Sequence, residues 1–135
     1  MAFDYGLRRI GVAVGNCLLG TTTPLSVLPA KDGVPDWSVL KRLVDEWTPD
    51  LLVVGEPLNM DGSPSELSAQ ASRFARRLHG RLGIAVVSVD ERLSSFEAEQ
   101  RLLDMDLSRA KRKERLDALA AADILQTFLD QKAGR

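Results

Sequence analysis

The first fifteen residues constrain the fold of this chain more than any other stretch. An apolar start leads into Asp4, and apolar residues then alternate with small ones over residues 10–14. Such alternation is typical of a half-buried strand, and Gly6 predicts a tight turn because glycine adopts positive φ without steric cost. We therefore expect a β-hairpin whose first strand ends near Asp4, so that its carboxylate projects from a sheet. An aspartate just before a turn glycine is also common as a plain turn residue, and this stretch alone leaves both interpretations open.

Length and composition favour one ordinary globular domain spanning residues 1–135. The chain is 44% hydrophobic and 27% charged, and its net charge of −1 argues against a generic nucleic-acid coat protein, which would be strongly basic. Cys17 is the single cysteine and cannot form an internal disulfide. No apolar run approaches the roughly 20 residues of a membrane span, and we expect a cytoplasmic protein.

The remaining hydrophobic pattern predicts alternating helices and strands. After the hairpin, the expected elements are a strand at 25–28, a helix at 37–47, a strand at 51–55, a helix from a capping box at 63–66 to Gly80, a strand at 84–89, a short helix at 94–104 and a last helix at 116–131. Residues 31–35 have the composition of a loop. This order predicts an α/β fold with a mixed five-stranded sheet and helices on both faces.

Carboxylates follow three of the predicted strands. Asp4, Glu56 and the pair Asp90–Glu91 fall at carboxyl ends, where open α/β sheets place their sites. In the last helix, Asp117 lies near the expected start and in line with the core-facing side, where a carboxylate is costly unless it is paired or binds a metal. It could instead favour the helix dipole, or the helix could be rotated enough to expose it.

Oxygen-rich clusters of this kind select hard cations such as Mg²⁺ or Mn²⁺. Two such ions can clamp the attacking and leaving oxygens of a phosphodiester. Asp123 lies about 120° from Asp117 on the helical wheel, which predicts an ordinary surface position. The basic run 109–115 either contacts phosphates or forms a solvated face, and the sequence favours neither.

Several motifs together resemble one known family, the YqgF/RuvX family of pre-16S rRNA nucleases, also called Holliday-junction-resolvase-like proteins. The matching stretches, in order along nearly the whole chain, are FDYG at 3–6, RIGVAVG at 9–15, VVG at 53–55, PLNMDG at 57–62, DERLS at 90–94 and DALAA at 117–121. Aspartate two residues before glycine would be a weak signal alone, whereas the set is specific.

The resemblance implies an RNase H-like fold and a metal-dependent nuclease that matures the 5′ end of 16S rRNA in the cytoplasm. The acidic residues of the family correspond here to Asp4, Glu91 and Asp117, which are therefore the expected catalytic residues and ligands of Mg²⁺ or Mn²⁺. Glu56 stands where the family usually has an apolar residue, and is either an additional ligand or a surface substitution.

The expected substrate is structured RNA, namely precursor 16S rRNA, or branched DNA, with ribosomal particles as further partners and a monomer or homodimer as the working form. The candidate nucleic-acid contacts are Arg8, Arg9, Asn59, Arg92, Arg109, Lys111, Arg112 and Lys113. Two alternatives keep the fold: a Holliday-junction-type DNA resolvase, and a non-catalytic RNA- or ribosome-binding module. An actin-like ATPase shares the Asp-x-Gly pattern but needs two duplicated domains, for which this chain is too short.

Overall fold

The computed structural model describes residues 1–57, 59, 61–90 and 109–132, with the backbone alone over 109–116. The strands are β1 Ala2–Asp4, β2 Arg9–Asn16, β3 Thr21–Lys31, β4 Val34–Pro35, β5 Leu52–Glu56 and β6 Val86–Asp90. The helices are α1 Trp37–Trp47, α2 Glu66–Leu82 and α4 Arg109–Lys132. The predicted helix at 94–104 lies outside the described residues.

The strands form one mixed sheet in the order β4-β3-β2-β1-β5-β6. The first four strands pair antiparallel along the chain, whereas β1, β5 and β6 are parallel neighbours. Over the described residues the sheet has six strands where the sequence predicts five, because β4 pairs with the end of β3. Asp32 and Gly33 both have positive φ, 51° and 81°, which suits a two-residue hairpin turn and explains why this segment has the composition of a loop.

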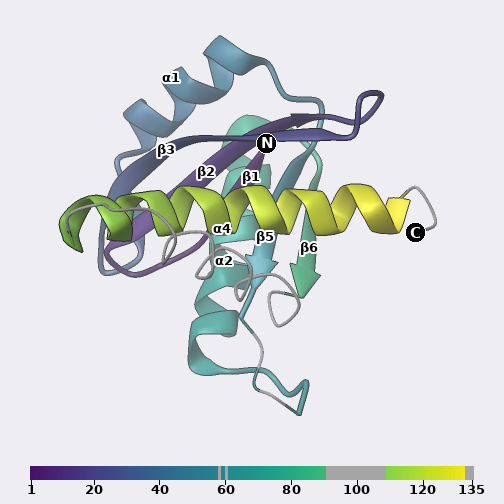
Figure 1. The fold of residues 1–135 in the computed structure, drawn as a ribbon. Helices are drawn as coiled ribbons and strands as arrows, with labels where there is room; N and C mark the ends of the chain where they lie inside the picture. Colours follow the sequence, from purple (N-terminus) through teal and green to yellow (C-terminus); the bar gives the residue numbers. More distant parts are fainter. Residues whose placement is uncertain (58, 60, 91–108, 133–135) are drawn as a thin grey trace.

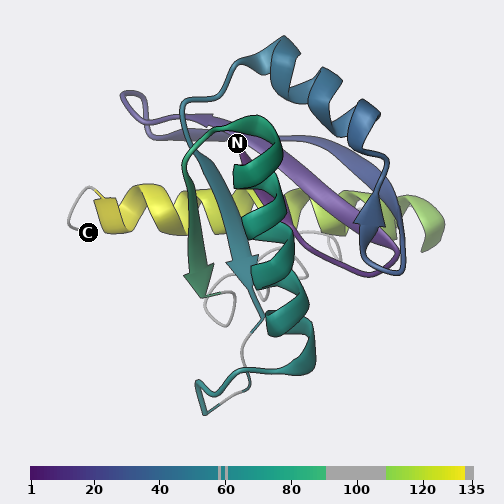
Figure 2. The same cartoon turned by 180° about the vertical axis from the view of Figure 1, so that it is seen from behind.

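Helices cover both faces of the sheet, as predicted. Figures 1 and 2 show α4 crossing one face, with α1 and α2 on the other. Between the sheet and α2, Phe74 packs edge-on against Phe3 and tilted against Tyr5, with ring centroids 5.8 Å and 5.0 Å apart. On the opposite face, Val53 packs in one cluster with Ile124 of α4. Strand side chains alternate between these two clusters, so each strand residue can be assigned to a face.

The helix ends differ in detail from those predicted. Ser65 is the N-cap of α2 and its capping-box partner is Ser68, so the box begins two residues later than expected. The helix continues through Gly80, because Gly83 provides the left-handed cap after Leu82. By contrast, α1 begins after Asp36, as predicted, with the Asp36 side chain accepting a hydrogen bond from the Ser38 amide.

The last helix is longer than predicted and more deeply enclosed. It begins at Arg109, so the basic run 109–115 forms its first turns and Asp117 lies well inside it instead of near its start. Asp123, predicted at the surface, is buried, with 6% of its area exposed. The helical-wheel argument assumed one buried face, whereas five consecutive residues, 121–125, are buried.

The sequence predicts a positive φ at Gly6, but Gly6 does not have one. Its role in the turn is steric. A β-carbon at Gly6 would lie 2.5 Å from the carbonyl oxygen of Arg9, so the β1–β2 connection requires the absence of a side chain. Among the described residues, no helix is both long enough and apolar enough to cross a membrane.

Candidate active site

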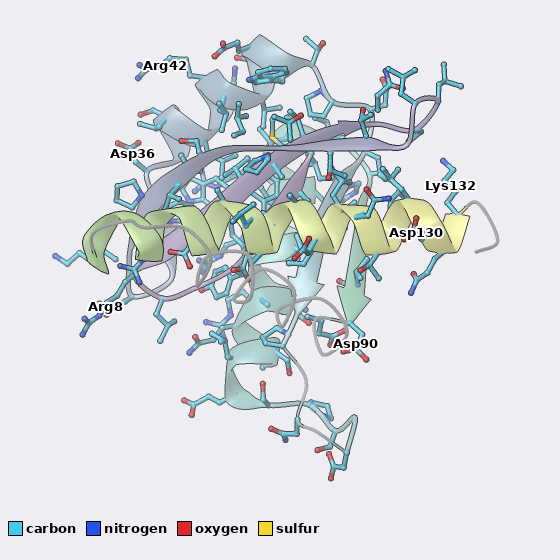
Figure 3. The ribbon with its side chains drawn as sticks, viewed as in Figure 1. Arg8, Asp36, Arg42, Asp90, Asp130 and Lys132 are labelled. Carbon is cyan, nitrogen blue, oxygen red and sulfur yellow. The ribbon has the colours of Figure 1, made fainter. Side chains whose placement is uncertain are left out.

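Three carboxylates end adjacent parallel strands, as the sequence predicts. Asp4 ends β1, Glu56 ends β5 and Asp90 ends β6, and Glu56 is the register partner of Asp90. Figure 3 labels Asp90 at the tip of its strand. The ends of parallel strands meet at one edge of the sheet, so these residues share that edge. Glu91 and Arg92, which follow Asp90, lie outside the described residues.

The two faces of the sheet separate these carboxylates. Ala2 packs in the cluster that includes α4, whereas Phe3 packs toward α2. Alternation along β1 therefore places Asp4 on the α4 face. The same alternation along β5, from Val53 on the α4 face, assigns Glu56 to the α2 face. Of Asp4 and Glu56, it is Asp4 that shares a face with the last helix.

Gly11 connects Asp4 to Asp117. It is the register partner of Asp4 across the β1–β2 pair, where opposed Cα atoms are about 4.5–5.5 Å apart. A β-carbon on Gly11 would collide with the main-chain carbonyl of Asp117 and would lie 3.1 Å from the amide nitrogen of Ala118. The backbone of α4 thus rests on β2 beside Asp4. The packing brings two of the three predicted catalytic residues, Asp4 and Asp117, next to Gly11 on the α4 face.

Arg9 holds the side chain of Asp117. Its Nε donates a hydrogen bond to Asp117 Oδ2 at 2.8 Å, and the two side chains are 34% and 22% exposed. Arg9 lies two residues before Gly11 on β2 and therefore on the same face of the sheet. The pair is partly exposed, so water screens it and its net contribution to stability is small. Its main consequence is to orient one carboxylate oxygen toward the β1–β2 turn.

The carboxylate oxygens of Asp4 and Asp117 suit a hard divalent cation. Asp4 and Asp117 are half-buried carboxylates, the ligand type that Mg²⁺ and Mn²⁺ prefer. Within the described part of the chain, no three acidic, histidine or cysteine side chains gather closely enough to hold a metal. Glu91, the third predicted ligand, lies outside the described residues.

A cavity of about 560 Å³ opens beside Asp117. The β1–β2 turn lines one side with Leu7, Arg8 and Arg9, and the first turns of α2 line the other. Nothing in the sequence assigns Glu66, Leu67 or Gln70 of α2 to the site, because hydrophobic periodicity locates buried faces and carries no information about hollows between elements. They line the cavity because α2 begins next to the turn.

The other predicted nucleic-acid contacts within the described residues lie in the loop at Asn59 and on the first turns of α4. Asn59 donates from its side-chain amide to Ser63 Oγ at 3.0 Å and to the carbonyl oxygen of Pro64 at 3.2 Å, which closes its own loop. Residues 109, 111, 112 and 113 lie on the first turns of α4, and their side chains are outside the described part of the structure. The sequence-based assignment of these residues stays a prediction.

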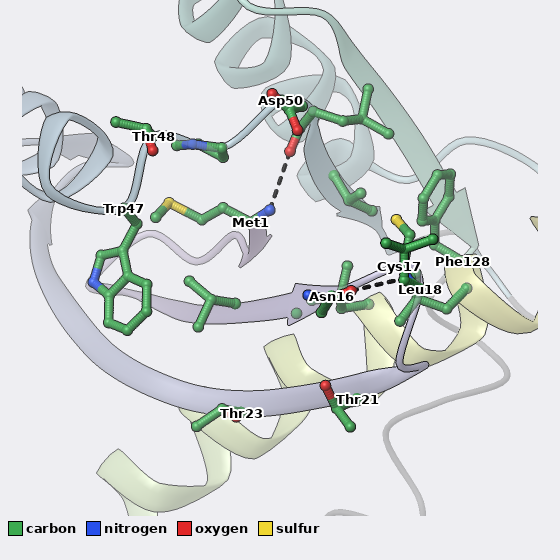
Figure 4. A pocket seen from close by; sticks show the side chains of 17 residues that line it. Met1, Asn16, Cys17, Leu18, Thr21, Thr23, Trp47, Thr48, Asp50 and Phe128 are labelled. Atoms are coloured by element: carbon green, nitrogen blue, oxygen red, sulfur yellow. Dashed lines mark hydrogen bonds between the residues drawn. The ribbon is translucent and has the colours of Figure 1, made fainter.

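A second cavity, of about 600 Å³, lies at the other end of the sheet. It is lined by Met1, which precedes β1, and by Asn16, which ends β2, whereas Asp4 ends β1. Figure 4 shows this cavity, with Trp47 and Phe128 among its walls and Asp50 at its edge. It is slightly larger than the cavity beside Asp117, but it lies away from the carboxylate edge.

Comparison with known proteins shows the family of this chain. The model of the RuvX family, described as Holliday junction resolvase, matches residues 1–131. The chain belongs to the RuvX family. A protein of Azotobacter vinelandii named "Putative pre-16S rRNA nuclease" is 53% identical over 132 residues, which cover 98% of this chain and 93% of the relative.

Two further relatives in the RuvX family carry the same name as the Azotobacter vinelandii protein. The Yersinia enterocolitica protein is 48% identical over 99% of this chain and 96% of its own length, and the Escherichia coli K12 protein is 47% identical over 97% and 95%. The solved structure of Thermus thermophilus RuvC with a Holliday junction substrate aligns with a TM-score of 0.53 at 17% identity, covering 98% of this chain and 93% of that one. The predicted RNase H-like fold is confirmed.

Proposed function

We propose that this protein is a nuclease that hydrolyses phosphodiester bonds of structured RNA and matures the 5′ end of precursor 16S rRNA in the cytoplasm. The observation that carries the proposal is the placement of Asp4 and Asp117 on either side of Gly11 in a RuvX family chain. The names of its relatives support RNA as the substrate. Residues 1–135 act as one domain, as a monomer or homodimer, alone or on ribosomal particles.

Asp4, Glu91 and Asp117 would hold the metal, Mg²⁺ or Mn²⁺. When bound, a divalent ion of this kind activates water and stabilises the oxyanion that leaves the phosphodiester. Strand alternation places the Glu56 side chain on the α2 face, opposite Asp4. Glu56 would serve as a ligand only if its side chain reached around the end of β5. Asp4, Glu91 and Asp117 are accordingly the proposed catalytic set, with Glu56 as the auxiliary residue.

The remaining charged residues of the site would position the substrate. Arg9 orients the carboxylate of Asp117 through its Nε, and Arg8 beside it is exposed. Arginine forks match phosphate oxygens well, so these two residues would contact phosphates next to the cleaved bond. Asn59, Arg92 and the basic residues at 109, 111, 112 and 113 would extend that contact along the strand.

A second candidate is cleavage of branched DNA. The description of the RuvX family as Holliday junction resolvase favours it, and the chemistry at the carboxylates would be the same. The third candidate function is a non-catalytic module that binds RNA or the ribosome. Substrate and metal dependence separate the three functions.

The deciding experiment is a cleavage assay on precursor 16S rRNA and on a four-way DNA junction, each with Mg²⁺, Mn²⁺ or EDTA. We expect cleavage of the RNA with metal and none with EDTA. Asp4→Asn and Asp117→Asn should abolish it while the protein stays folded. Asp45→Asn is the matched control, because Asp45 is exposed on α1 and pairs with Lys41 at 2.9 Å. Full cleavage by Asp4→Asn would refute the catalytic site, and cleavage of the junction alone would favour the resolvase.

A further inference from the structure

The cavity beside Asp117 has the dimensions of a ligand site. Its volume of about 560 Å³ lies within the 300–1,000 Å³ of typical small-molecule sites. It lies between the β1–β2 turn and the start of α2, and Asp117 borders it. Whatever occupies the cavity therefore lies next to Asp117, one of the proposed catalytic residues.

One wall of the cavity is basic. Arg8 is exposed, and Arg9 uses its Nε to bind Asp117 at 2.8 Å. A guanidinium carries five N–H donors, so this bond engages one of the five on Arg9. Two adjacent arginines that line the same cavity suit a phosphate group.

The opposite wall combines two polar side chains with apolar surface. Glu66 and Gln70 are four residues apart on α2 and so lie on the same side of the helix. Carboxylate and amide groups are the ones that recognise the polar edges of bases. Leu7, with 44% of its area exposed, and the half-buried Leu67 provide apolar surface within the same cavity.

We propose that this cavity binds one unpaired nucleotide of the substrate strand, with its phosphate at Arg8 and Arg9 and its base against Glu66 and Gln70. The proposal rests on the proposed nuclease function. A base can enter such a cavity only when it has left the stack and exposed its pairing edge. The enzyme would thereby select cleavage positions at single-stranded or unpaired nucleotides, whether the strand is RNA or DNA.

The test is to fill the cavity from its α2 wall. Gln70→Phe puts a bulky ring into it, and Ala69→Phe is the matched control because Ala69 is exposed on the same helix, one residue away. Binding is measured by fluorescence anisotropy in EDTA, which prevents cleavage. The probes are labelled single-stranded RNA and DNA oligonucleotides and a fully paired RNA duplex.

We expect Gln70→Phe to weaken binding of single strands about tenfold, the scale of losing one hydrogen-bonded contact to a base. Duplex binding should stay within twofold of the wild type (about 0.4 kcal/mol by the tenfold-per-1.4 kcal/mol relation), and Ala69→Phe should change neither. Equal affinities of Gln70→Phe and Ala69→Phe for single strands would overturn the proposal, as would an equal loss on duplex. Weaker binding of single-stranded RNA alone, or of single-stranded RNA and DNA alike, would support the proposal. The pattern would also tell whether the cavity accepts RNA only or both nucleic acids.

Gln70→Ala provides a second variant if Gln70→Phe does not fold. It removes the amide but keeps a good helix former, and should weaken single-strand binding without affecting the duplex. Equal weakening of single strand and duplex by Gln70→Ala would overturn the cavity proposal. The cleavage assay is independent of these measurements. Cleavage by the wild type with no effect of residue 70 would remove the cavity proposal and keep the nuclease, whereas binding that depends on residue 70 without cleavage would do the reverse.

Discussion

Gly11 lies directly beneath the main-chain carbonyl of Asp117, so closely that a β-carbon has no room. This contact joins β2 to α4 at the level of Asp4, the register partner of Gly11. The distance between the two proposed catalytic aspartates therefore depends on the absence of one side chain on a strand between them.

Gly11→Ala should destabilise the fold and displace Asp117. The added methyl group must push α4 away from β2, which costs about 1–3 kcal/mol in a packed interior. Urea unfolding measures the change. Gly80→Ala is the control, since a β-carbon at Gly80 meets nothing within 4 Å and should be neutral or stabilise α2 by up to about 1 kcal/mol. If both variants unfold like the wild type, the contact between β2 and α4 is looser than described.

Arg9→Gln should change nucleic-acid binding more than stability. The ion pair with Asp117 is partly exposed, so its loss should lower the free energy of unfolding by less than about 1 kcal/mol. If Arg9 also contacts a phosphate, the dependence of binding on salt concentration should become shallower by about one unit of slope. Arg42→Gln, on α1, is the control; Figure 3 labels Arg42 and Arg8 on separate parts of the molecule. An unchanged salt slope would leave Arg9 only its bond to Asp117.

Tyr5→Phe should lower stability by about 1 kcal/mol at neutral pH. The hydroxyl of Tyr5 donates to the carbonyl oxygen of Gly33 at 3.0 Å, and phenylalanine keeps the ring against Phe74 but not this bond. Thermal unfolding of both proteins measures the difference. No loss of stability would show that water replaces the hydroxyl.

Burial raises the pKa of Tyr5 above its usual value of 10.0, which predicts an effect at alkaline pH. The folded state then keeps the phenol proton more tightly than the unfolded state. Stability should therefore fall as pH rises above about 10, and Tyr5→Phe should lack this part of the decline. The chain has one tyrosine, so its ultraviolet titration follows Tyr5 alone. Ionisation at or below the usual value would contradict the burial of the hydroxyl.

Asp36 should stabilise α1 in a pH-dependent way. The Ser38 hydroxyl and then the Ser38 amide donate to its carboxylate, and these hydrogen bonds lower the pKa of Asp36 below its usual value of 3.8. The stabilisation is therefore present above about pH 4 and lost as pH falls through the lowered pKa. Asp36→Ala should unfold more easily at neutral pH, and Asp36→Asn should keep the cap without the acid dependence. Identical acid unfolding of wild type and Asp36→Asn would argue against the charged cap.

Millimolar Mg²⁺ or Mn²⁺ should raise the melting temperature of the wild type more than that of Asp4→Asn. A ligand that binds only the folded state stabilises it, by about 2.7 kcal/mol at a hundred times its dissociation constant. In EDTA, Asp4→Asn should melt at or above the wild-type temperature, because it removes one of the gathered negative charges. Melting curves at neutral pH with EDTA and with metal measure both effects. Equal responses of the two proteins would mark Asp4 as a turn residue.

Local sequence patterns predict the hairpin, the strand-end position of Asp4, the capped start of α1 and the mixed sheet with helices on both faces. These features follow from alternation, helical spacing and local capping, which act over a few residues and can be read along the chain. The same periodicity placed Asp117 on the sheet-facing side of the last helix. Chain-wide motifs then identified the family.

Three features could not be predicted in this way: the ion pair between Arg9 and Asp117, the burial of Asp123 and the cavity next to Gln70. Each depends on how elements distant in the sequence dock: α4 rests on Gly11, and α2 begins beside the β1–β2 turn. Periodicity shows which side of one element is apolar, and it does not show how closely a second element approaches or what hollow remains between them. Those outcomes are set by packing, where the absence of one methyl group at Gly11 determines where a carboxylate lies.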